Sequence, residues 1–126
     1  MHTTNSAARR VDVILRALLV ALFTIAGAMK LTAHPFEVQG FQHFGYAPWF
    51  MYAIGIIEFA GAFALLHVRL LPAASATLGA VLIGAVWSHL KAADPLAMTI
   101  PALVMLLMLA WLATIHMSGR KVPERA

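Results

Sequence analysis

The sequence contains no cysteine. Disulfide exchange, thiolate catalysis and iron–sulfur ligation by this chain are therefore excluded, because each needs a cysteine sulfur. Charged residues are also scarce, at 11% against about 25% in typical soluble domains, whereas 62% of the residues are hydrophobic. A soluble fold of 126 residues cannot cover that much apolar surface, so the composition predicts an integral membrane protein.

Motifs for catalysis and for metal binding are missing as well. The chain has no glycine-rich phosphate loop and no spacing that recommends a Ser/His/Asp triad. Its six histidines never recur three or four positions apart on one predicted helix, which disfavours a zinc or haem site. The sequence therefore favours a non-catalytic role over an enzyme, and we expect no catalytic residue and no metal.

The charge that is present is mostly positive, with a net charge of +4 and a pI near 10.1. These residues lie at segment ends instead of forming a stripe, so they indicate membrane topology and not a nucleic-acid partner. With four spans, the side holding both termini carries Arg9, Arg10, Arg16, Arg69, Arg120, Lys121 and Arg125, and the other side carries Lys30 and Lys91. This imbalance predicts that both termini lie in the cytoplasm.

The hydrophobic runs predict an all-α fold, an integral membrane four-helix bundle that forms a single domain. The expected spans are 11–31, 48–66, 72–90 and 95–117, with basic tails at 1–10 and 118–126. A short interfacial helix is expected over 35–44, opened by Pro35 and ended by Gly45. The first segment also fits a cleavable signal peptide, but we expect it to stay as a span because its charged region extends through Arg16.

Glu58 is the one carboxylate inside the run 49–66, near its middle. An ionisable group at membrane depth costs roughly 2.5 to 3.5 kcal/mol on insertion scales, so it needs a partner, water or a function. At 100° per residue, Gly55 and Gly61 lie within about 60° of Glu58, whereas Phe59 lies more than about 90° away. We therefore expect Glu58 to point into the bundle.

Two polar layers follow from the estimated depths of the charged residues. Arg16 is expected to reach Glu58 in the cytoplasmic half, and Lys30, His89 and Asp94 are expected to gather at the outer mouth. Two alternatives remain open: the Arg16 and Glu58 pair only fixes helix register, and the residues at the mouth are only solvated at the headgroup level.

Small residues indicate where helices approach one another. Gly27 shares a helix face with Arg16, and Gly55 and Gly61 flank Glu58. On the predicted span 72–90, four small residues recur at strict four-residue spacing and form a ridge that suits close helix contact. They are Ala76, Ala80, Gly84 and Ser88.

Five short motifs in this order resemble the DoxX-like family of small four-helix membrane proteins. They are Ala26–Leu31, Gly45–Trp49, Ile54–Ala62, Gly84–Pro95 and Pro101–Leu103. The resemblance extends over about residues 16–111. It implies a bacterial inner-membrane bundle whose recurrent polar positions match Lys30, Glu58, His89 and Asp94. It also implies a link to membrane redox systems, because the DoxX group is named after a thiosulfate:quinone oxidoreductase.

Together these features suggest an accessory or ligand-binding subunit of a quinone-linked membrane redox system. Such a subunit would hold a quinone or another small lipophilic molecule in the bundle, beside the lipid bilayer and a membrane or redox partner protein. One alternative is a small proton-coupled transporter that acts as a homo-oligomer, with Glu58 taking up and releasing the proton. Another is a purely structural interaction subunit.

Overall fold

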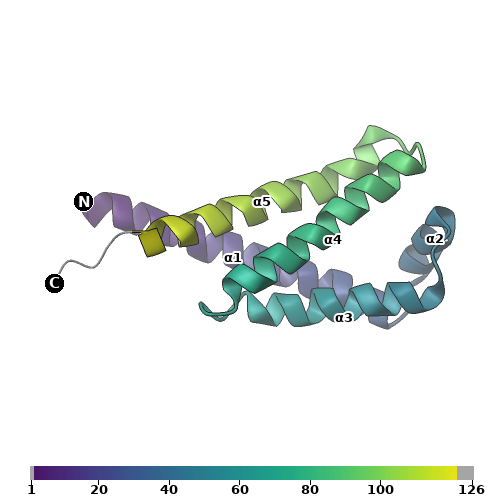
Figure 1. Ribbon diagram of the computed structural model, residues 1–126, viewed down its shortest axis with the longest axis horizontal. Helices are drawn as coiled ribbons and strands as arrows, with labels where there is room; N and C mark the ends of the chain where they lie inside the picture. Colours follow the sequence, from purple (N-terminus) through teal and green to yellow (C-terminus); the bar gives the residue numbers. More distant parts are fainter. Residues whose placement is uncertain (1, 122–126) are drawn as a thin grey trace.

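The computed structural model describes residues 2–121 and shows an all-helical chain (Figure 1). Four long helices are joined in sequence, with a short one between the first two. They are α1 (His2–Leu31), α2 (Pro35–Phe44), α3 (Pro48–Ala64), α4 (Leu71–Lys91) and α5 (Leu96–Lys121). No strand occurs in this part of the chain, so the predicted all-α class is confirmed.

Three helices within the described residues are long and apolar enough to cross a membrane. They contain the candidate spans Ser6–Leu31, Leu71–Lys91 and Leu96–Met117. A fourth span results if α2 and α3 are counted together, although these two helices are bent by 120° relative to each other. Large apolar side chains cover the outside of the bundle, among them Val13, Ile14, Ile83, Leu107 and Trp111. This surface suits lipid, and it identifies the chain as a membrane protein.

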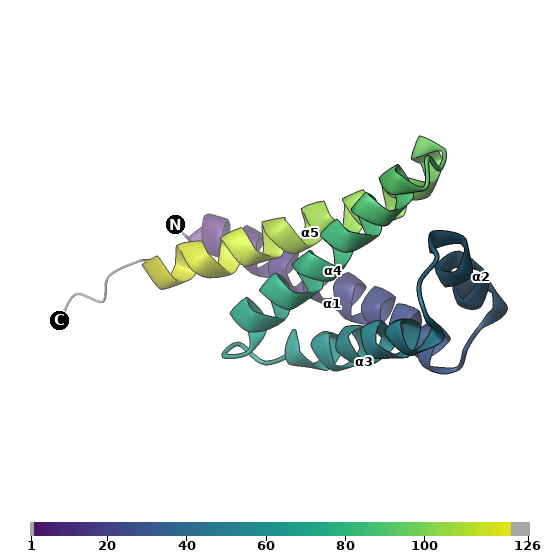
Figure 2. The same cartoon turned by 45° about the vertical axis from the view of Figure 1, so that its right-hand side comes forward.

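The core runs along the long helices and consists mostly of leucine, together with Phe23, Ala62 and Ala74. Its largest fully buried side chains are Leu19, Phe23, Leu65, Leu71, Leu78 and Leu112. Helix α1 packs against α3 and α5, and α4 packs against α3 and α5. The start of α1 and the end of α5 lie at one end of the molecule, which we call the terminal end, and α2 lies at the opposite end, which we call the α2 end (Figures 1 and 2).

The short helix α2 has the bounds that the sequence predicted. Pro35 occupies its first turn, where a missing N–H costs nothing, and the His34 side chain accepts a hydrogen bond from the Phe36 backbone N–H. Gly45 ends the helix with φ of 80°, a conformation that other residues adopt at a cost.

The predicted tails need correction. Helix α1 begins at His2, so most of the segment 1–10 is helical, because it contains neither proline nor glycine to stop the helix. Helix α5 likewise continues past Met117 to Lys121. The remainder of the second predicted tail, 122–126, lies outside the described residues.

Candidate functional site

A cluster of three charged side chains from three helices is the main polar feature of the apolar bundle. Lys30 is near the end of α1, Glu37 is in the first turn of α2 and Glu58 is in the middle of α3. Lys30 Nζ lies 2.8 Å from Glu58 Oε1 and donates a hydrogen bond of 3.3 Å to Glu37 Oε1. Lys30 is 8% exposed and Glu58 5%, so the pair is buried. We call these three residues the Lys30 cluster.

The contact between Lys30 Nζ and Glu58 Oε1 is a close, buried ion pair. An ammonium group carries three N–H donors, and in the Lys30 cluster two carboxylates share them. With one carboxylate oxygen from each glutamate beside it, the ammonium keeps one N–H for a further acceptor.

The position of α1 along α3 explains why Lys30, and not Arg16, meets Glu58. A Cβ added to Gly27 would lie 2.8 Å from the Phe59 backbone nitrogen, so the two helices touch at this level. Glu58 is thus level with about residue 27, which places Lys30 about 5 Å along the helix and Arg16 about 16 Å away at 1.5 Å per residue. The expected pair of Arg16 with Glu58 is therefore wrong.

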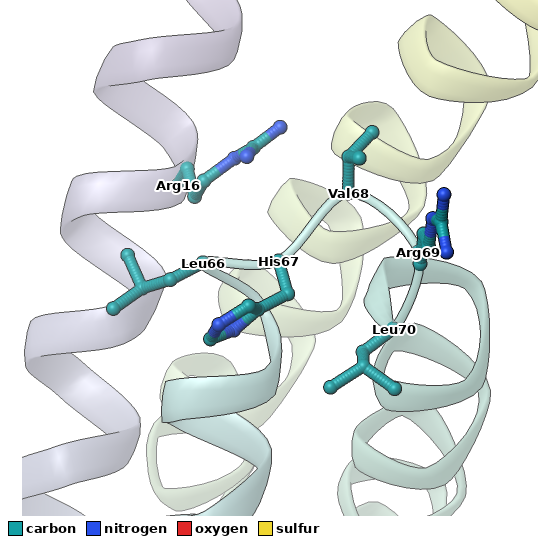
Figure 3. Close-up of a pocket in the computed structure, with 6 residues that line it drawn as sticks. All are labelled: Arg16, Leu66, His67, Val68, Arg69 and Leu70. Atoms are coloured by element: carbon teal, nitrogen blue, oxygen red, sulfur yellow. The ribbon is translucent and has the colours of Figure 1, made fainter.

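Arg16 instead pairs within its own helix. Its Nη2 donates to both carboxylate oxygens of Asp12, one turn earlier, at 2.9 and 3.2 Å. Arg16 lies opposite the connection 65–70 between α3 and α4, beside an open hollow at the terminal end (Figure 3). Arg16 therefore lies level with the end of α3, too far from Glu58 to line a site beside it.

A second polar cluster joins α2 to the end of α4. Asp94 accepts from both neighbouring histidines, with His89 Nδ1 at 2.8 Å and His43 Nε2 at 2.7 Å. The Phe44 ring meets the His89 ring edge-on at 5.0 Å. The structure thus brings His89 and Asp94 together as expected, but Lys30 belongs to the other cluster and the grouping of all three is wrong.

Asp94 lies in the connection between α4 and α5, outside the candidate spans. The hydrogen bonds from His89 and then His43 hold the pKa of this carboxyl below its usual range, because they favour its charged form. Beside this cluster, the Tyr46 hydroxyl and the Ser88 hydroxyl are 2.6 Å apart. The segment 43–46 is therefore tied to α4 at two points.

The small residues divide into two groups. Gly27, Gly55 and Gly61 lie at close helix contacts, and a Cβ added to Gly55 would meet Lys30 Cβ at 2.8 Å. The ridge on α4 behaves differently, because its first three members, Ala76, Ala80 and Gly84, are exposed. Only Ser88 is buried, so this ridge packs against no helix of the described chain along most of its length.

Sequence reasoning missed three residues that complete these clusters. Glu37 interrupts the phenylalanine face of α2, and this misplaced charge was the available signal for a buried partner. His43 and Tyr46 gave no such signal, because their partners lie 51 and 42 positions away. No group of three metal-ligating side chains suitable for a metal ion occurs in residues 2–121.

Comparison with known proteins adds a family and one curated relative. The sequence signature of the DoxX-like family matches residues 14–112, in agreement with the resemblance drawn from the five motifs. The chain is 28% identical over 102 residues to "Uncharacterized protein YdgD" of Bacillus subtilis (strain 168), which covers 77% of this chain and 90% of the relative. No solved structure matches the chain.

Proposed function

This chain belongs to the DoxX-like family, and from that premise we propose that it binds a small lipophilic molecule of the quinone class at the Lys30 cluster. In this proposal the chain is an accessory subunit of a membrane redox system in the bacterial inner membrane, with both termini cytoplasmic. The observation that carries the proposal is the buried ammonium of Lys30 between carboxylates of two other helices. Such a group is expensive inside a bilayer, and intramembrane charges usually mark a site that is used.

The chemistry of the Lys30 cluster suits a carbonyl oxygen on an apolar ring. An ammonium N–H can donate to a quinone oxygen, and a charge-assisted bond of this kind is stronger than one between neutral groups. The two carboxylates can accept the two protons released when a quinol is oxidised to a quinone and its two electrons pass to a redox partner protein. Exposed apolar residues on the helices around the cluster, such as Leu31 and Ile56, suit an isoprenoid tail.

Helix α2 supplies the entrance in this account. None of its residues is buried, and its first turn carries Glu37, whose side chain is 15% exposed and is the member of the Lys30 cluster nearest the outside. A molecule that enters from the lipid beneath α2 would reach Lys30 without crossing the leucine core. The function of α2 is then to cover the site.

Mass spectrometry of extracted small molecules tests the proposal. Four forms of the chain are purified from the native membrane in mild detergent. They are wild type, Lys30→Met, the double variant Lys30→Met/Glu58→Gln and the control Lys91→Met. We expect quinone enriched over bulk membrane with wild type and Lys91→Met, because Lys91 is exposed at the end of α4. Both Lys30 variants should retain about tenfold less, the effect of losing one charged hydrogen bond.

The double variant is the decisive sample, because it removes both charges of the buried ion pair and leaves only the partly exposed Glu37 carboxylate. It therefore separates loss of ligand from loss of fold better than Lys30→Met alone. Equal quinone in wild type and the double variant, with the chain folded, would contradict the proposal. A structural interaction subunit would then be the better account.

A further inference from the structure

The terminal end of the molecule carries an open hollow, about 590 Å³ in volume, that is separate from the Lys30 cluster (Figure 3). One wall is Arg16 on α1. The other is the connection between α3 and α4, and the lining residues on that side are Leu66, His67, Val68, Arg69 and Leu70. The hollow therefore brings together basic side chains that are far apart in sequence.

The charge of this hollow is positive and incompletely balanced. Arg16 uses Nη2 for Asp12, but its buried Nε has no hydrogen-bond partner among the described residues. Arg69 has no ion pair in that part of the chain, and Asp12 is the one carboxylate paired with a lining residue there. An anion is the natural complement of this arrangement.

The hollow is also amphipathic. Leu66, Val68 and Leu70 are exposed on either side of Arg69, so basic and apolar side chains alternate along the connection. In a bilayer this connection lies at the end of α3, where headgroups meet acyl chains. A phospholipid has this distribution, with a charged phosphate above an apolar tail.

We propose that the hollow between Arg16 and the connection 65–70 binds the phosphate of an anionic phospholipid headgroup. The guanidinium groups of Arg16 and Arg69 bind the phosphate oxygens, since guanidinium geometry matches phosphate. His67 Nδ1 donates to the Phe63 carbonyl at 3.3 Å, which leaves the ring Nε2 as a further polar atom of the lining. The leucines and Val68 contact the first carbons of the acyl chains.

Native mass spectrometry of the full-length chain tests this site. Phosphatidylglycerol and phosphatidylcholine are titrated separately, and the Kd of the first bound lipid is measured for wild type, Arg69→Gln, Arg16→Gln and the control Arg10→Gln. Arg10 is exposed and does not line the hollow, so it matches the charge loss without touching the site. We expect phosphatidylglycerol to bind more tightly than phosphatidylcholine, and Arg69→Gln and Arg16→Gln each to weaken it about fivefold, the worth of one basic residue near the surface.

Arg69→Gln is the safer variant, because Arg69 is exposed in a connection, whereas Arg16 also holds Asp12. Arg10→Gln should leave the Kd unchanged. Equal weakening by Arg10→Gln and Arg69→Gln, or equal binding of the two lipids by wild type, would overturn the proposal. A further titration adds millimolar inorganic phosphate: no displacement supports the lipid as the source of the phosphate, and displacement assigns the same site to a soluble phosphate.

Discussion

Lys30 is the residue on which the polar interior depends. The helical repeat predicted correctly that Glu58 points inward, because angular position on a helix follows from 100° per residue. It did not predict the partner, because the sequence contains no information on how far one helix is displaced along its neighbour. That displacement is set by Gly27 and Gly55, whose lack of side chains lets α1 and α3 touch at the level of Lys30.

Removing one side of a buried ion pair leaves the other charge without compensation, which typically costs about 3 to 5 kcal/mol. We therefore expect Lys30→Met and Glu58→Gln to lower the stability unequally. Lys30→Met leaves two carboxylates without their cation, whereas Glu58→Gln leaves Lys30 bonded to Glu37. Thermal unfolding in detergent should rank wild type above Glu58→Gln and Glu58→Gln above Lys30→Met.

The double variant completes this cycle. Lys30→Met/Glu58→Gln should recover about 1 kcal/mol or more of the loss caused by Lys30→Met alone, because neighbouring charges couple. Strictly additive losses would mean that the two side chains do not interact in the folded chain.

At the scale of elements, α2 shows which boundaries the sequence predicts well. Its start at Pro35 and its end at Gly45 follow from backbone chemistry, and both are confirmed. The predicted start of the first helix at residue 11 was wrong. The stretch from His2 to Arg10 contains no proline or glycine that would end a helix, and charge alone does not end one. The attachment of α2 to α4 through Asp94 was also missed, since it depends on a tertiary contact.

Asp94 makes this attachment sensitive to acid. Its pKa is lowered by the bonds from His89 and His43, so the folded chain binds this proton less readily than the unfolded chain. The charged Asp94 carboxylate therefore stabilises the folded chain fully at pH values above its pKa in the unfolded chain, about 3.9. This stabilisation is lost as the pH falls through the lower pKa of Asp94 in the folded chain. We expect titration of Asp94 to raise amide exchange in α2 in that acid range. Between pH 7 and about 4 it should cause no increase.

Asp94→Asn reproduces the loss of charge at neutral pH. Amide exchange in α2 should rise at pH 7 in this variant, while exchange in the core of α1 around Phe23 should stay as in wild type. Unchanged protection of α2 would show that Tyr46 and Ser88 hold the helix without Asp94.

At the scale of the whole molecule, the bundle separates two kinds of polar site. The α2 end holds the Lys30 cluster and the second cluster, which is Asp94 with His43 and His89, and the terminal end holds the basic hollow. The leucine and phenylalanine core lies between them. Composition alone identified the membrane class, motif order identified the family, and the estimated depths placed Arg16 and Lys30 in separate polar layers. That Glu58 belongs with Lys30 depends on helix packing that no local pattern encodes.

The central claim is that the Lys30 cluster binds a quinone headgroup. The most direct measurement is titration of a short-chain benzoquinone into the full-length chain in nanodiscs. Binding is monitored as quenching of the fluorescence of the chain's three tryptophans. Wild type and Lys91→Met should show saturable binding with the same Kd, and Lys30→Met/Glu58→Gln should bind at least about tenfold more weakly, as expected for loss of a charged hydrogen bond. The same Kd in the folded double variant as in wild type would contradict the claim.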